Sequence, residues 1–131
     1  MQKTGILNPH LLSLLARIRH TNLLVIADRG FPCFPQLETV DISLVDGIPS
    51  VLQVVEALRP NYDFTQAYMA EQFLAENTPE TQARFRAALH GIPLAFEPYL
   101  EMKARVPSAL GLIRTGDTIQ YANMILVSGR P

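Results

Sequence analysis

The sequence has little of what marks a secreted, metal-binding or membrane protein. Its one cysteine, Cys33, has no partner for an internal disulfide, and no cysteine–histidine spacing is typical of a metal site. No apolar run approaches the roughly 20 residues that span a bilayer, and no basic segment followed by an apolar one predicts a secretion signal. The net charge is only -1, and the sequence contains no block of like charges, so we expect neither nucleic acid nor membranes as partners. We therefore expect a cytoplasmic protein.

What the sequence does contain indicates one compact domain over residues 1–131. Nearly half of the chain, 48%, is hydrophobic. A chain of this length buries roughly two-thirds of its unfolded surface, which is enough for a self-supporting core.

Apolar periodicity and turn residues predict strands that alternate with helices. We expect helices over 9–19, 50–58, 79–89 and 99–106, and strands over 23–27, 40–44, 64–69, 95–97, 110–114 and 119–127. Because only a short turn at Thr115-Gly116-Asp117-Thr118 separates the last two strands, they are expected to pair as a C-terminal antiparallel hairpin. The alternation predicts an α/β fold with a mixed β-sheet flanked by helices.

Two candidate functional residues, His20 and Asp28, stand at the two ends of one apolar strand. A histidine after a helix can simply interact with the negative end of the helix dipole, or it can transfer protons near neutral pH. An aspartate before a Gly/Pro loop can be an ordinary turn residue, or it can bind a ligand at the carboxyl end of a strand. Both interpretations stay open for each residue.

The spacing of His20 and Asp28 limits how they can cooperate. At about 3.3 Å per residue, an extended segment between them separates the two side chains by roughly 20 Å or more. One small ligand cannot then contact both within a single chain. Either the strand is shorter than predicted, or a neighbouring subunit supplies one end of the site.

Other polar residues have a structural and a functional interpretation as well. Tyr121 and Asn123 are two apart in a predicted strand, so their side chains would share one face. The two side chains would either be solvated or form hydrogen bonds with neighbouring hydroxyls of a ligand. Lys103 has the pattern of an ordinary surface lysine. The three histidines lack partners at ligand spacing, which predicts no metal site.

Four segments of the sequence resemble the D-ribose pyranase and L-fucose mutarotase (RbsD/FucU) family. They are Thr4-Gly5-Ile6-Leu7-Asn8-Pro9-His10-Leu11, the unit from His20 to Asp28, Ile113-Arg114-Thr115-Gly116-Asp117, and Tyr121-Ala122-Asn123-Met124-Ile125-Leu126. The resemblance implies a single RbsD/FucU-like domain, closer to the ribose pyranase branch. It also implies an isomerase that interconverts the cyclic forms of a free aldose such as ribose or fucose, without cofactor or metal.

The resemblance further assigns roles to residues. It implies that His20 is the catalytic acid/base and that the substrate-binding residues are Asp28, Tyr99, Lys103, Tyr121 and Asn123. It also implies a ring-shaped homo-oligomer with sites at subunit interfaces, although the sequence does not give the number of subunits.

Two positions depart from the ribose pyranase pattern. Tyr99 stands where a histidine is expected, and Arg29 stands where a small residue is expected, next to Asp28 and able to pair with that carboxylate or to reach a substrate oxygen. Both leave the preferred aldose open. They also keep open a non-catalytic monosaccharide-binding or regulatory protein, while a structural oligomer without ligand leaves the polar residues unexplained.

Overall fold

A six-stranded sheet with one reversed strand forms the centre of the molecule. The computed structural model describes residues 1–130, and its strands lie in the order β2-β5-β1-β6-β3-β4. The strands are β1 (Leu23–Ala27), β2 (Thr39–Asp41), β3 (Phe64–Ala70), β4 (Leu94–Glu97), β5 (Gly111–Arg114) and β6 (Met124–Ser128). The β6 strand runs antiparallel to its neighbours β1 and β3, whereas the other neighbouring pairs are parallel. The other strands therefore all end at the sheet edge at which β6 begins.

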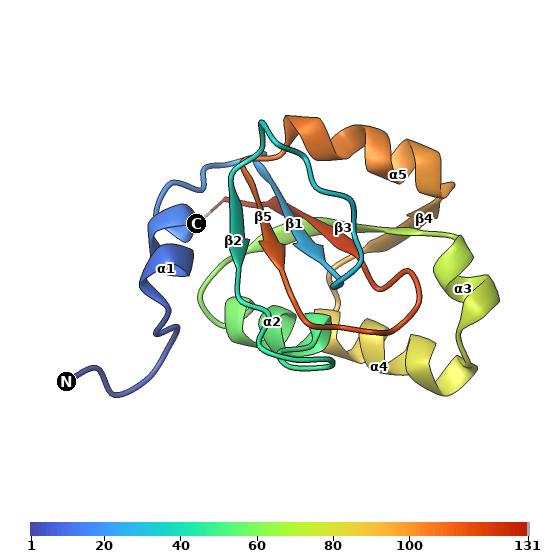
Figure 1. Cartoon of the computed structure of the whole chain (residues 1–131), viewed down its shortest axis with the longest axis horizontal. Coiled ribbons are helices and arrows are strands. Elements are labelled where there is room, and N and C mark those ends of the chain that lie inside the picture. The colour runs from blue at the N-terminus through green and yellow to red at the C-terminus, as the bar shows by residue number, and fades with distance from the viewer. Residues whose placement is uncertain (131) are drawn as a thin grey trace.

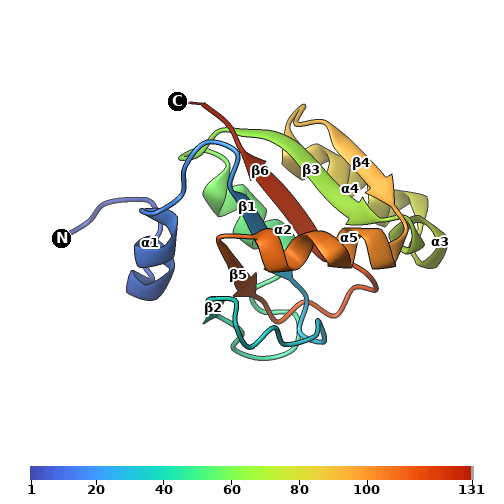
Figure 2. The ribbon, with the colours of Figure 1, turned by 90° about the horizontal axis from the view of Figure 1, so that it is seen from above.

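Helices cover both faces of this sheet. They are α1 (Pro9–Leu15), α2 (Val51–Leu58), α3 (Gln72–Glu76), α4 (Pro79–Leu89) and α5 (Tyr99–Arg105), the last followed by a 3-10 turn at Val106–Ser108. Figure 1 shows α2 and α4 below the sheet and α5 above it, and Figure 2 shows α5 crossing the strands. Within the described residues, none of the helices has both the length and the apolar character needed to cross a bilayer.

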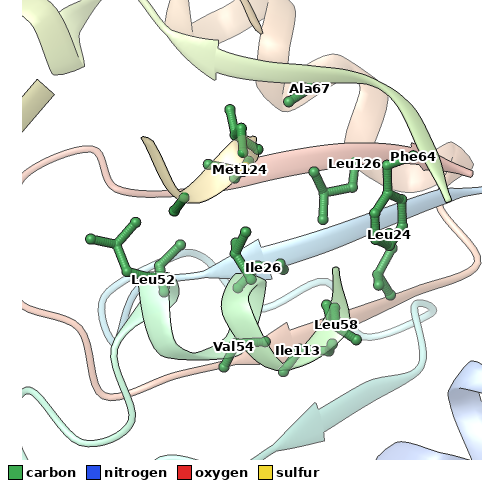
Figure 3. Packing of buried hydrophobic residues seen from close by; sticks show 14 of the residues in the cluster. Leu24, Ile26, Leu52, Val54, Leu58, Phe64, Ala67, Ile113, Met124 and Leu126 are labelled. Atoms are coloured by element: carbon green, nitrogen blue, oxygen red, sulfur yellow. The ribbon is translucent and has the colours of Figure 1, made fainter. Parts of the chain in front are cut away.

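The β1 strand is apolar at every position because both of its faces are covered. Leu24 and Ile26 pack in the larger core on the α2 side, whereas Val25 and Ala27 pack in a second core with Met102 of α5. Successive side chains of a strand point to opposite faces, so a strand between two helical layers needs a continuous apolar run. Figure 3 shows Leu24 and Ile26 directed at α2.

The α2 helix is fixed at its start and along one side. The Ser50 hydroxyl accepts from the Gln53 N–H at 3.1 Å, and the Gln53 side chain accepts from the Ser50 N–H at 2.9 Å. This reciprocal pair satisfies two N–H groups that the helix itself leaves free. Leu52, Val54 and Leu58 then enter the core beneath the sheet (Figure 3).

The predicted α/β class and mixed sheet are confirmed, and β1 and α4 have their predicted bounds. The helix predicted over 9–19 ends earlier, at Leu15, because the N–H groups of Arg17 and Ile18 bond three residues back and tighten the chain out of the α-helix. The short α3 helix was not predicted.

The predicted C-terminal hairpin is wrong. The β5 and β6 strands do not pair with each other; β1 lies between them, parallel to β5 and antiparallel to β6. After β5 the Thr115 N–H donates to the Ala27 carbonyl at 2.9 Å, and the Gly116 N–H donates to the Pro49 carbonyl at 2.9 Å. These bonds carry the segment across the end of β1 before β6 begins, so the connection is a crossing loop and no tight turn forms.

Gly116 lies where two backbone segments meet, which gives a test of the fold. A Cβ atom at this position would meet the backbone carbonyl oxygens of Val45 and Ile48, the latter at 2.7 Å. Gly116→Ala should therefore lower the free energy of unfolding by about 1–3 kcal/mol, because backbone atoms cannot rotate away. Gly30→Ala is the control, since its Cβ would meet only Asp28 Oδ1 at 3.8 Å. Urea unfolding of both variants measures the difference, and equal stability would contradict the packing.

Candidate active site

A polar hollow lies at the edge of the sheet where β1 ends and β6 begins. Three segments form it: the turn after β1, the start of α5 after β4, and the loop that leads into β6. Its volume is about 180 Å³, and the lining residues are Asp28, Gly30, Phe31, Tyr99, Gln120, Tyr121 and Asn123. Pockets for drug-sized ligands measure about 300–1,000 Å³, so this hollow suits a smaller polar molecule. Its position is the usual place for a ligand in an α/β sheet.

Asp28 is the carboxylate of this hollow, and its turn is held from several sides. Its backbone N–H donates to Asn123 Oδ1 at 2.7 Å, and its own Oδ1 accepts from the Gly30 N–H at 3.0 Å. Partial burial raises the pKa of Asp28 above its ordinary value, and the nearby Asp117 acts in the same direction. Hydrogen bonds from the Gly30 and Phe31 backbone and from the Asn123 side chain oppose this rise. A carboxylate of this kind is ready to accept hydroxyl donors from a ligand.

Tyr121 and Asn123 reach the same hollow, but not as neighbours on a strand face. The strand predicted over 119–127 begins only at Met124, and Tyr121 has a left-handed backbone with φ of 54°. The reason is a turn: the Asp117 carboxylate accepts from the Ile119 N–H at 2.8 Å and keeps the segment out of the sheet. Asn123 is only 3% exposed, and its side-chain oxygen accepts the hydrogen bond from the Asp28 N–H.

Tyr99, the first residue of α5, completes the wall of the hollow. Its ring meets that of Tyr121 edge-on, with centroids 5.5 Å apart, and its N–H donates to Gln72 Oε1 at 3.0 Å. Burial raises the pKa of the Tyr99 phenol, and the charge of Asp28 adds to this effect. The phenol therefore remains protonated at neutral pH. Lys103 lies beside it, with Nζ 5.9 Å from the ring centroid, but is not among the residues that line the hollow.

His20 lies at the opposite edge of the sheet. It precedes β1, and it lines a different hollow, of about 540 Å³, together with Tyr62, Asp63 and Ser128 at the end of β6. The whole of β1 separates His20 from Asp28. The structure thus brings together Asp28, with Tyr99, Tyr121 and Asn123, and leaves His20 outside this group.

Some features of the hollow differ from the sequence prediction. Arg29 does not pair with Asp28; it forms an exposed ion pair with Asp46 at 2.9 Å. Phe31 and Gln120 line the hollow but were not predicted, although each is close in sequence to a predicted residue. No group of three or more metal-ligating side chains occurs within residues 1–130.

The fold defines the class of this protein, and comparison with known proteins identifies its family. The fold and its edge site define an α/β protein with a small polar pocket at the end of a mixed sheet. The model of the RbsD / FucU transport protein family matches residues 1–131, so the chain belongs to that family. The D-ribose pyranase of Geobacillus kaustophilus (strain HTA426) is 40% identical over 129 residues, covering 98% of this chain and 94% of the relative. The D-ribose pyranase of Laribacter hongkongensis (strain HLHK9) is 35% identical, covering 98% of each.

Solved structures show the same architecture. Bacillus subtilis RbsD, determined in complex with D-ribose, matches with a TM-score of 0.91 at 31% identity and covers 100% of this chain and 99% of its own. The fucose mutarotase of Streptococcus pneumoniae in complex with L-fucose matches with a TM-score of 0.79 at 19% identity, covering 95% of this chain and 94% of its own. The second likeness shows a shared fold.

The raised pKa of Asp28 has a consequence for stability. Because folding raises this pKa, the contribution of the group to stability is fully present below its unfolded-state pKa and is lost as the pH rises through the folded value. Asp28→Asn should therefore be more stable than the parent at pH 7, and the difference should vanish in acid.

NMR titration of the carboxyl carbons measures the pKa of Asp28 directly. Asp28 should titrate above its ordinary value of 3.8. Asp41 is the internal control: partial burial acts to raise its pKa, but hydrogen bonds from Ser43 and Arg114 outweigh this and hold it below 3.8. The reverse order of titration would contradict the assigned environment of Asp28.

Proposed function

We propose that this protein is a cofactor-independent sugar isomerase that interconverts the cyclic forms of a free aldose, with a pentose such as ribose as the first candidate. The observation that supports it most is the polar hollow with Asp28, Tyr99, Tyr121 and Asn123 in a chain that matches D-ribose pyranases over 98% of its length. A small hollow with a carboxylate, an amide and two phenols offers complementary partners for sugar hydroxyls.

The reaction proceeds through the open-chain sugar. A base removes the proton of the anomeric hydroxyl, the bond between the anomeric carbon and the ring oxygen breaks, and an acid protonates that ring oxygen. Closure by another hydroxyl, or onto the other face of the carbonyl, gives the new ring form. No electron or group leaves the sugar, so the proposed chemistry needs only positioned proton donors and acceptors.

In our proposal, each residue of the hollow has its own role in binding the sugar for this reaction. The Asp28 carboxylate accepts hydrogen bonds from sugar hydroxyls and fixes the ring. Tyr99 stays protonated, because burial and Asp28 raise its pKa, and it therefore serves as a hydrogen-bond donor and not as a proton shuttle. Tyr121 and Asn123 contact further hydroxyls, while Lys103 supports the Tyr99 ring from outside the lining.

The hollow lacks a group that titrates near neutral pH. Its lining holds one carboxylate and two phenols but no histidine, and His20 lies at the far edge of the sheet. An imidazole is the usual side chain for proton transfer at pH 7. We therefore propose that His20 of one copy enters the Asp28 hollow of a neighbouring copy. Such a contact joins two different surfaces, as in a ring-shaped oligomer.

Two-dimensional NMR exchange spectroscopy tests the activity. Without added metal or nucleotide, the protein should accelerate exchange between ring forms for at least one sugar of a panel that contains ribose and fucose. His20→Gln should lower the rate by about 10²–10⁴-fold, the usual contribution of a positioned acid/base. His10→Gln is the matched control, because this exposed histidine lines neither hollow.

The outcomes separate the candidate functions. Sugar binding without accelerated exchange would favour the non-catalytic monosaccharide-binding protein. Equal losses in the His20 and His10 variants would refute the role of His20, and the absence of both binding and exchange would refute the sugar site.

A further inference from the structure

Arg114, the last residue of β5, binds the backbone of the Asp28 turn from outside the hollow. Its Nε and Nη2 both donate to the carbonyl oxygen of Arg29, at 3.1 and 2.8 Å. Its Nη1 donates to the Asp41 carboxylate at 2.8 Å and to the Ser43 hydroxyl at 2.9 Å. The planar guanidinium thus joins three segments that are far apart in the sequence.

The N–H groups of the turn have partners within or next to the site. The Asp28 N–H donates to Asn123, and the Arg29 N–H donates to the Asp117 carbonyl at 3.1 Å. The Gly30 N–H donates to the Asp28 carboxylate. The carbonyl oxygen of Arg29, by contrast, has the Arg114 guanidinium as its one hydrogen-bond partner among residues 1–130.

We infer that Arg114 is a positioning residue, which holds the turn after β1 in the shape that presents the Asp28 carboxylate to the sugar. The inference rests on the proposed function for its kinetic part. Arg114 does not line the hollow, so it acts on the ligand through Asp28 and not by contact. A shift of the turn by a fraction of an ångström is enough to weaken hydrogen bonds whose geometry is narrow.

Three variants separate the carbonyl contact from general electrostatics. Arg114→Gln removes the forked donor, whereas Arg114→Lys keeps the charge near Asp41 but cannot place two donors on one oxygen in the same plane. Asp41→Asn removes the anionic partner and leaves the contact with the Arg29 carbonyl. Arg17→Gln is the matched control, since Arg17 makes a comparably exposed two-point pair with Glu38, at 2.6 and 2.7 Å, and Glu38 directly precedes β2, at the opposite edge of the sheet.

Amide hydrogen exchange measures the positioning itself, whether or not the chain is an isomerase. In Arg114→Gln the N–H groups of Arg29 and Gly30 should exchange about tenfold faster, the equivalent of losing one hydrogen bond to a charged group. Arg114→Lys should show a smaller increase and serves where the Gln variant does not fold. Arg17→Gln and Asp41→Asn should leave both amides within about twofold of the parent, which is within the usual range for surface substitutions. Unchanged amides in both Arg114 variants, or an equal effect of Asp41→Asn, would overturn the inference.

The kinetics of sugar ring exchange then measure how the position of the turn affects substrate binding. Arg114→Gln should raise KM about tenfold with kcat within about twofold, because the proton-transferring group is untouched while the binding carboxylate is displaced. A fall in kcat with unchanged KM would overturn the positioning role. If the parent protein accelerates no exchange, the proposed function fails, and the amide result still decides whether Arg114 holds the turn.

Discussion

The buried carboxylate of Asp117 connects the parts on which the site depends. It is only 2% exposed, and its two oxygens accept from the N–H of Val51 at the start of α2 and the N–H of Ile119, both at 2.8 Å. Its backbone carbonyl accepts from the Arg29 N–H. One residue thus anchors a core helix, starts the loop that carries Tyr121, and holds the turn after β1. A buried polar side chain is stable only when its hydrogen-bonding atoms have partners, so these three segments are fixed relative to one another.

The reversed β6 strand explains why the site forms at this edge. Because β6 runs against its neighbours, the chain enters it from the edge at which β1 ends. Asn123, directly before β6, therefore meets the Asp28 backbone, although 95 positions separate the two residues. The hairpin expected from the sequence would have left β5 and β6 adjacent and would have removed β1, with Asp28, from between them.

Local signals in the sequence predicted the elements better than their order. The continuous apolar run of β1 and the bounds of α4, with Pro79 in its first turn, follow from near neighbours alone. The sheet order depends on pairing between distant strands and on the contacts that lead residues 115–123 past β1, which no local pattern encodes. The left-handed conformation of Tyr121 could not be predicted from the local sequence either, because a bulky residue adopts it only where tertiary contacts impose it.

The candidate site likewise combines features that the local sequence predicts with features that only the folded chain determines. The strand spacing alone predicted that His20 and Asp28 are too far apart to share a ligand within one chain, and the structure places them at opposite edges. Phe31 and Gln120 were missed because their side chains belong to the hollow only through the conformation of two loops. Arg29 was expected to pair with Asp28 or to reach a substrate oxygen, but its long side chain instead forms an ion pair with Asp46 on another segment.

Complementation between two impaired variants, assayed at sugar concentrations below KM, tests the central claim, a site shared by two copies, most directly. His20→Gln and Asp28→Asn chains are unfolded together, refolded as a mixture, and assayed for ring-form exchange; a mixture of His20→Gln with the double variant serves as the control. If each site combines His20 of one copy with Asp28 of its neighbour, random assortment restores about a quarter of the sites. The mixture should then recover up to that share of the parent rate, and the control should recover nothing. If both residues act within one chain, every site carries a defect, and a mixture without recovered activity would contradict the shared site.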